Sequence, residues 1–410
     1  MNLTQIETIL LHGAHFTKEQ REVIQAKGRI DVVAGPGSGK TTVLAAKVLA
    51  LLTNRKCEDK GICCITHTNV AVKEILERLK LGGVDEIEYP NFVGTIQSFM
   101  DKFLGRVAFA NILPEVTLKL LEEEKFYEKY EKNFRRIVTD YPPDYNVPKP
   151  ANNGCELVIQ EDGSFYYTNN HRRYKTAINL ACKWLLEDGF ISYTDLKSLC
   201  YWYLRKYINE LSVAFGERFS YLMLDEAQDT DQVQMAIISG LAKSQKLNVQ
   251  RFGDPYQALY TIYGAETEDS WKPSPDNVLY RTKEISETTR FGSSIAAVVR
   301  DVCVEEYEHF HSNQELDFFP KYFITYETGD ELKDKQDRLI EGAAASNPEF
   351  RVSQMPDAIV GIMHSDVMKI DSHYSKEGAK QRAHEKSVSE IRALIIKLLA
   401  SANGLSLVEE

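Results

Sequence analysis

The sequence predicts an α/β fold in which helices cover both faces of a parallel sheet. Three observations support this fold class. Short apolar runs alternate with helical patterns over the first hundred residues, as they do in parallel sheets. A glycine-rich loop joins the first apolar run to the first helical pattern. Later apolar runs lead into acidic residues, which places carboxylates at strand ends, where such sheets bind their ligands.

Hydrophobic periodicity gives the expected order of elements. Apolar and β-branched runs predict strands over residues 29–34, 61–66, 221–224 and 247–252. Apolar residues at helical spacing predict helices over residues 41–53 and 69–79. Residues 101–204 interrupt this alternation with largely helical patterns. Within them, two apolar runs flank Asp162 and Gly163, which favours a β-hairpin.

These patterns predict three parts. The first is a lobe made of residues 1–100 and 205–280. The second is a mainly helical subdomain with a hairpin, inserted into that lobe over residues 101–204. The third is a partial second lobe over residues 281–410, with further strand candidates and a final helix near residues 380–402.

Composition limits the class of protein. Of 410 residues, 43% are hydrophobic, yet no apolar run reaches the length that crosses a membrane. The N-terminus lacks a basic cluster, so we expect no signal peptide and a cytoplasmic location. The seven cysteines form no CxxC pair, which favours reduced thiols over a disulfide framework or a zinc site.

The net charge of −11 has the wrong sign for coating a polyanion by bulk attraction. Binding to nucleic acid would therefore need a local basic groove. The same residues are equally compatible with ordinary solvated helix faces. The candidates are Lys132, Arg135, Arg136, Arg172, Arg173 and Lys175.

The glycine-rich loop predicts a nucleotide site. Glycines let backbone N–H groups surround phosphate oxygens, and the helix that follows adds its dipole. Lys40 would reach the β- and γ-phosphates, and the Thr41 hydroxyl would hold Mg²⁺. A chance glycine-rich turn is the alternative, but the flanking strand and helix argue against it. The loop residues are Ala34, Gly35, Pro36, Gly37, Ser38, Gly39, Lys40, Thr41 and Thr42.

An acidic pair follows the strand expected at residues 221–224. Asp225 would hold Mg²⁺ beside the loop, and Glu226 would orient or deprotonate the attacking water. Upstream, Thr17 and Gln20 have capping-box spacing, so Gln20 marks a helix start. The sharper interpretation is that the Gln20 amide binds the adenine edge.

Several short blocks follow one another along the chain. They are Gln20, the phosphate loop, 66–69 (Thr-His-Thr-Asn), 93–98 (Val-Gly-Thr-Ile-Gln-Ser), 225–229 (Asp-Glu-Ala-Gln-Asp), 253–257 (Gly-Asp-Pro-Tyr-Gln) and Arg290. Together, and in this order, they resemble superfamily 1 DNA helicases of the UvrD/Rep type. The resemblance covers residues 16 to about 300 without the insert. It implies a RecA-like P-loop lobe, ATP and Mg²⁺ as substrate and cofactor, and single-stranded DNA as the track. Helicase-like proteins of phage-defence systems carry similar blocks.

The resemblance also implies roles for single residues. Gln257 would sense the γ-phosphate, and Gln228 and Asp229 would couple the acidic pair to it. Arg290 would reach the cleft from the second lobe as an arginine finger, with a surface arginine as the alternative.

Residues on the DNA side are implied in the same way. They would touch the strand, with His67 in the place of the family's aromatic stacking residue and Tyr260 as a further stacking platform. The implied set is Thr66, His67, Thr95, Gln97 and Tyr260.

The leading hypothesis is an ATP-dependent DNA helicase or translocase. The family's late blocks, including a second arginine finger, are not found before Glu410, so we expect weak ATPase activity and little unwinding by this chain alone. The alternative is a regulatory ATP-binding or DNA-sensing subunit that docks on a nuclease or on another repair or defence protein.

Overall fold

The computed structural model divides the chain into two compact units, Met1–Leu316 and Asp317–Glu410. It describes residues 1–54, 60–243, 247–257, 271, 273, 279–302, 309–313, 324–346 and 364–370. The predicted final helix at residues 380–402 and the predicted DNA contact Tyr260 lie outside these ranges. Among the described helices, none is both long enough and apolar enough to cross a membrane.

The main sheet confirms the predicted α/β class. Within the described ranges it has six strands in the order β10-β1-β9-β8-β2-β3, and every neighbouring pair is parallel. The strands are β1 (Ile30–Ala34), β2 (Gly61–Thr66), β3 (Phe92–Thr95), β8 (Phe219–Leu224), β9 (Asn248–Gly253) and β10 (Arg281–Ile285). The strands expected at residues 29–34, 61–66, 221–224 and 247–252 are all present, with ends shifted by no more than two residues.

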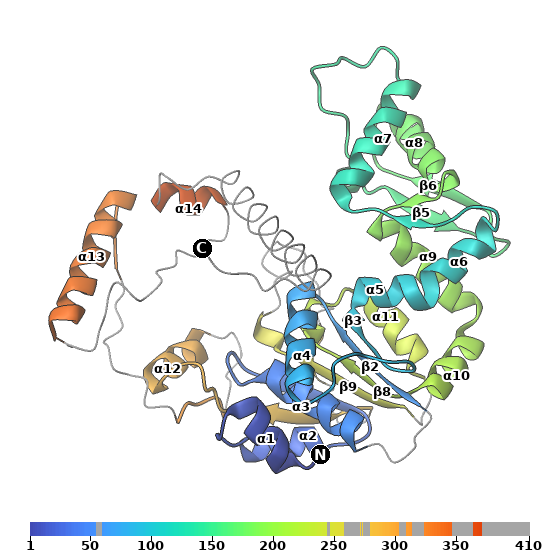
Figure 1. Ribbon diagram of the computed structural model, residues 1–410. Helices are drawn as coiled ribbons and strands as arrows, with labels where there is room; N and C mark the ends of the chain where they lie inside the picture. The colour runs from blue at the N-terminus through green and yellow to red at the C-terminus, as the bar shows by residue number, and fades with distance from the viewer. Residues whose placement is uncertain are drawn as a thin grey trace, which may run out of the picture. The chain divides into compact units, whose positions relative to one another are not determined.

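Alternating side chains place a separate core on each face of this sheet. Along β2, Cys63 and Ile65 join one core while Ile62 and Cys64 join the other. This period of two is what a strand buried on both faces requires. One face is covered by α1 (Leu3–Leu11), α2 (Lys18–Gln25), α3 (Lys40–Thr53) and α4 (Asn69–Leu81). The other is covered by α5 (Ile96–Met100), α10 (Ile208–Arg218) and α11 (Gln232–Leu241) (Figure 1).

Between β3 and β8 the chain forms the elements of the inserted region. A π-helical turn, Asp101–Gly105, joins α5 to α6 (Arg106–Ile112), and α9 (Tyr193–Lys206) leads back toward the sheet. The remaining elements are α7 (Glu123–Ile137), α8 (Lys175–Glu187), the short parallel pair β4 (Lys119–Leu120) and β7 (Phe190–Ile191), and the hairpin β5 (Glu156–Ile159) and β6 (Phe165–Thr168).

The hairpin predicted around Asp162 and Gly163 is confirmed. Strands β5 and β6 pair antiparallel, and Gly163 adopts a φ of 90° in the turn. The Asp162 carboxylate accepts a hydrogen bond from the backbone N–H of Ser164 at 2.8 Å. An aspartate that bonds its own backbone two residues on, followed by a glycine, accounts for a turn at this position.

Strand β10 corrects the boundary predicted at residue 281. It lies in the first sheet, paired in parallel with β1 from Ile30 to Ala34. β1 has backbone groups to satisfy along both edges, and β9 pairs with only one of them. Helix α12 (Ser293–Val302) follows in the same unit. The described parts of the second unit are α13 (Gly329–Ser346) and α14 (His364–Ile370).

Candidate functional site

The glycine-rich loop lies between β1 and α3, at the carboxyl edge of the sheet. Gly37 and Gly39 have φ values of 72° and 79°, which residues with a Cβ rarely adopt. Gly39 is the N-cap of α3, so Lys40 and Thr41 begin the helix. The Ser38 hydroxyl is buried and has no hydrogen-bond partner among the described residues. The loop backbone therefore has the shape of a phosphate site, and the Ser38 hydroxyl is left without a partner beside it.

Lys40 and Glu226 face each other across this edge. The Lys40 ammonium donates to Glu226 Oε2 at 2.5 Å. Burial alone would raise the pKa of Glu226, but the charge of Lys40 and hydrogen bonds from Gln228 and Lys40 outweigh it and leave the pKa lowered. Glu226 therefore stays ionised near neutral pH, the form that accepts a proton.

The backbone of Glu226 is unusual. Its φ of 51° and ψ of 48° put it in the left-handed region, where a residue with a Cβ costs roughly 1–2 kcal/mol. The strain occurs where β8 ends and the chain turns into the short helix Ala227–Asp229. Such strain is commonly found at functional sites, where it directs a side chain that regular backbone would not.

Asp225 precedes Glu226 and is fully buried. Its backbone N–H continues the pairing of β8 with β2 by donating to the Ile65 carbonyl at 2.8 Å. Burial, followed by the negative charge of Glu226, raises the pKa of Asp225 to about 7, although the Lys40 charge opposes the shift. Neither carboxylate oxygen has a hydrogen-bond partner among the described residues.

These orphaned oxygens fit a magnesium ion. A buried carboxylate without partners is unfavourable unless a cation accompanies it. Thr41 and Asp225 would hold Mg²⁺ here, with most of its other oxygen ligands coming from phosphates and water. In the described part of the chain, no group of three or more His, Cys, Asp or Glu side chains forms a metal site by itself.

A chain of polar contacts leads from Glu226 to β9. The Gln228 amide donates to Glu226 Oε2 at 2.8 Å and accepts from the Asp254 backbone N–H at 3.0 Å. The Asp254 carboxylate in turn accepts from the Gln257 amide at 2.6 Å. The structure thus brings Gln228 and Gln257 together with the acidic pair. Asp254, the middle of this chain, had no role assigned from the sequence, although it lies within one of the family's blocks.

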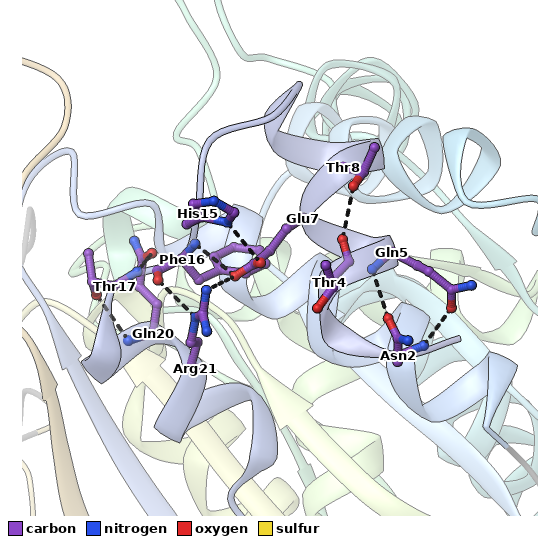
Figure 2. A network of polar contacts seen from close by, with 10 residues as sticks. All are labelled: Asn2, Thr4, Gln5, Glu7, Thr8, His15, Phe16, Thr17, Gln20 and Arg21. Atoms are coloured by element: carbon purple, nitrogen blue, oxygen red, sulfur yellow. Dashed lines mark hydrogen bonds and ion pairs between the residues drawn. The ribbon is translucent and has the colours of Figure 1, made fainter.

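Gln20 lies under the loop. It completes the capping box of α2, since its Oε1 accepts from Thr17 N at 2.9 Å, while its Nε2 donates to the Ser38 carbonyl at 2.9 Å. The predicted helix start is confirmed, and the amide also supports the phosphate loop. One further contact holds α2 in place, because Glu7 of α1 accepts from both the Arg21 side chain and the Phe16 backbone (Figure 2).

Lys47 of α3 is a buried cation that sequence patterns did not single out. Its ammonium donates to the carbonyls of Val23, Ile24 and Ala26 at 2.7–3.2 Å, at the end of α2. Burial lowers its pKa to about 7. Lys47 therefore fastens the helix that carries Gln20 to the helix that begins at the phosphate loop.

Arg290 reaches the loop from the first sheet, which corrects its predicted origin in a second lobe. The segment after β10 is held by Glu19, which accepts from the Ser286 backbone and hydroxyl at 2.7–2.9 Å. The Thr289 N–H then donates to the Gly37 carbonyl at 3.1 Å. A Cβ placed on Gly37 would lie 2.4 Å from the Arg290 Cβ. The arginine is therefore next to the loop, with its side chain exposed.

The predicted DNA-side residues lie at the ends of β2 and β3. Thr66 is only 1% exposed, so its hydroxyl does not reach the surface. This burial argues against the predicted direct contact with single-stranded DNA. The His67 ring bonds the Thr230 hydroxyl at 2.8 Å. Thr95 is the N-cap of α5 and accepts from Ser98 N, while Gln97 is exposed.

The predicted basic groove also receives only partial support. Arg135 is held by Glu131 and by the carbonyls of Pro142 and Tyr145. It therefore tethers the loop that contains Pro142 and Tyr145 to α7, and it is neither a free groove wall nor part of a freely solvated helix face. Arg136, Arg172 and Arg173 are at least partly exposed.

The fold and this site define a nucleotide-binding lobe of the P-loop class, with a RecA-like parallel sheet. The family profile of the UvrD/REP helicase N-terminal domain matches residues 16–272. The chain therefore belongs to the UvrD/REP helicase family.

Curated relatives agree with this assignment. The chain is 28% identical over 273 residues to a probable DNA helicase of Mycoplasma pneumoniae, covering 62% of this chain and 49% of that protein. It is 27% identical over 250 residues to Gabija protein GajB of Bacillus cereus, covering 61% and 41%. It is 25% identical over 260 residues to ATP-dependent DNA helicase PcrA of Staphylococcus aureus, covering 62% and 35%. The chain thus spans between about a third and a half of the length of these relatives.

Proposed function

We propose that this chain binds magnesium-ATP and hydrolyses it, and that hydrolysis drives movement along single-stranded DNA. The observation that carries the proposal is the contact of Lys40 with Glu226 beside the partnerless carboxylate of Asp225. Phosphoryl transfer to water requires a cation for the phosphates, a carboxylate that binds the metal and an ionised base. Lys40, Asp225 and Glu226 would supply these three groups at one edge of the sheet.

The residues divide the chemistry as follows. The terminal phosphates of ATP compete with Glu226 for Lys40, which leaves the Glu226 carboxylate able to accept a proton from water. Thr41 and Asp225 would hold Mg²⁺, which would neutralise charge on the terminal phosphates. Gln228 keeps Glu226 oriented, and Arg290, which lies next to Gly37, would stabilise charge on the transferred phosphoryl group.

The contact chain through Asp254 supports coupling to DNA. Gln257 ends that chain at the beginning of residues 258–270, which include the predicted contact Tyr260. A change in the contact between Gln257 and the γ-phosphate would reach Asp254 and Gln228, because these residues are already hydrogen-bonded in series. This coupling is part of the proposed motor function, so the comparison of ATP turnover with and without DNA tests both.

A regulatory ATP-binding subunit without motor activity is the second candidate. It is favoured by the burial of Thr66 and by the bond between His67 and Thr230, which leave few predicted DNA contacts at the surface. Such a subunit would dock on a nuclease or on another repair or defence protein. Its ATP site would respond to that partner rather than to a strand.

Steady-state ATP turnover with and without single-stranded DNA separates the two candidates. A motor gives turnover that rises with DNA and disappears in Lys40→Ala. An ATP turnover rate that is unchanged by DNA, together with no DNA binding at low salt, would support the regulatory subunit. A fluorescent tailed duplex added to the same chain should show little unwinding.

A further inference from the structure

The inserted region carries a pair of cysteines that the nucleotide site does not use. Cys155 lies directly before β5, after Gly154, whose φ of 57° turns the chain. Cys182 lies on the buried face of α8. The two sulfur atoms are 3.8 Å apart, in contact across 27 positions of sequence.

The other described cysteines are arranged differently. Cys63 and Cys64 are adjacent on β2 and point into opposite cores. Cys200 of α9 lies against the Met100 carbonyl at 3.6 Å. Cys155 and Cys182 are therefore the pair, among the cysteines that the structure describes, whose thiols face each other from separate elements.

A cavity gives reagents access to this pair. It has a volume of about 810 Å³, lies between α7, the start of α9 and the chain before β5, and is lined by both cysteines together with Tyr167 and Asp195. Cys155 is half-buried, whereas Cys182 is only 1% exposed. A small reagent in the cavity would thus meet Cys155 first. Cys182 would then react with the modified Cys155 rather than with the reagent.

The negative charge around the cavity favours neutral reagents over anionic ones. The lining carboxylates are those of Glu123, Glu124, Glu128, Glu156 and Asp195, and Lys149 is the only lining residue that carries a positive charge. An anionic oxidant such as glutathione disulfide is repelled by this rim. A small neutral peroxide is not.

The same surroundings slow the reaction. The hydrogen bond to Cys155, together with burial, holds the pKa of the Cys182 thiol well above its usual range. Thiolate is the reactive form, so Cys182 is a poor first nucleophile. Exposure, by contrast, makes Cys155 the first to react.

We propose that Cys155 and Cys182 are a modification site, at which a small neutral peroxide forms a reversible disulfide within the insert. The Cys155 thiolate attacks one peroxide oxygen, the O–O bond breaks, and hydroxide leaves and is protonated to water. The resulting sulfenic acid is then attacked by the Cys182 sulfur. The S–O bond breaks, a second water leaves, and two thiols plus hydrogen peroxide have become one disulfide and two waters.

The required movement is small. A disulfide needs sulfurs about 2.0 Å apart, so the two must approach by roughly 2 Å. The bond would tie the start of the hairpin to α8. Thiol reductants would reverse it by attack on the more exposed Cys155 sulfur.

The test uses the full chain with Cys57 and Cys303 replaced by serine. The thiols that remain are then those of Cys63, Cys64, Cys155, Cys182 and Cys200. The reduced protein is titrated with hydrogen peroxide, free thiols are alkylated under denaturing conditions, and peptides are mapped by mass spectrometry. The expected product is a peptide that joins Cys155 to Cys182 and disappears after dithiothreitol. Reduced protein should also bind phenylarsine oxide, which requires two neighbouring thiols, in a one-to-one ratio.

Three variants make the result decisive. Cys155→Ser and Cys182→Ser should each lose the joined peptide and phenylarsine oxide binding, while Cys200→Ser should keep both. Oxidation of Cys155 to sulfinic acid without a joined peptide would overturn the proposal. So would phenylarsine oxide binding that survives in Cys155→Ser.

Discussion

The nucleotide half and the proposed DNA half of the sheet's carboxyl edge differ in how their side chains are held. At the ends of β8 and β9, a row of polar groups is linked by direct hydrogen bonds, from Lys40 through Glu226 and Gln228 to Asp254. At the ends of β2 and β3, Thr66 is buried and Gln97 projects on its own. One half is already assembled for its proposed chemistry, whereas in the other His67 and Thr95 are bonded within the protein and few side chains are left for a DNA contact.

Physical chemistry accounts for this difference. Stabilising a phosphoryl group needs charges held within hydrogen-bond distance, so the protein must fix them in advance. Single-stranded nucleic acid without sequence preference is bound through stacking and backbone contacts, which tolerate adjustment. Substitutions should therefore have large effects in the first half and small ones in the second.

Lys40→Ala should cause the largest loss. It removes the side-chain cation at the phosphate loop, so ATP turnover should fall by on the order of 10³. Lys73→Ala, on the exposed side of α4, is the matched control and should leave turnover unchanged. Turnover of Lys40→Ala within about threefold of wild type would exclude this loop as the catalytic site.

Glu226→Gln should come next. The amide keeps the size of the side chain but accepts no proton, so hydrolysis should fall by roughly a hundredfold or more. Binding of a fluorescent ATP analogue should persist, because Lys40 and the loop backbone remain. Glu217→Gln, at an exposed ion pair with Lys60, serves as the control. Equal losses of binding and turnover would mean that Glu226 is structural.

Lys47 predicts a pH dependence of stability within the nucleotide half. Below pH 7 its amine is protonated in both folded and unfolded chains, so stability does not vary with pH on its account. Between pH 7 and about 10.5 the unfolded chain keeps a proton that the folded chain releases, so stability rises with pH, by up to about 1.4 kcal/mol per unit.

Chemical unfolding of wild type and Lys47→Met from about pH 6.5 to about 9 checks this, because the range starts below pH 7 and extends into the interval in which stability should rise. The methionine variant lacks the titrating amine, so the difference in unfolding free energy should change with pH. A difference that stays constant above pH 7 would show that Lys47 remains charged when folded.

Gln97→Ala should have the smallest effect. An exposed side-chain hydrogen bond contributes about 1 kcal/mol, so the dissociation constant for single-stranded DNA should rise about fivefold or less. The affinity of wild type for DNA should itself fall steeply with added salt. Gln25→Ala, exposed on α2, is the control. A hundredfold loss in Gln97→Ala would contradict the contrast drawn between the two halves.

Local patterns in the sequence were sufficient for much of the nucleotide half. The loop, the strand before it and the acidic pair are each contiguous, and the chemistry of each is readable within a few residues. The hairpin is local in the same sense, because Asp162 and Gly163 specify its turn.

What could not be predicted depends on pairing between distant segments. Nothing in residues 281–285 says that they pair with β1 rather than begin a new lobe, and so the origin of Arg290 was misplaced. The burial of Thr66 likewise follows from what packs over the end of β2. Lys47 acts through backbone carbonyls at the end of α2, and Asp254 acts through the side chains of Gln228 and Gln257; neither set of contacts can be read from the local sequence.

The position of β1 in the sheet has a consequence for synthesis. Its neighbours are β9 and β10, and Asp31 of β1 meets its partner Arg251 across 220 positions. The hairpin β5–β6 closes over a few residues and is complete long before that. As the chain leaves the ribosome, the insert is therefore able to fold while β1 still waits for both partners. Any product that stops before Asn248 leaves both edges of this apolar strand open, and such fragments should aggregate rather than accumulate as a smaller ATP-binding domain.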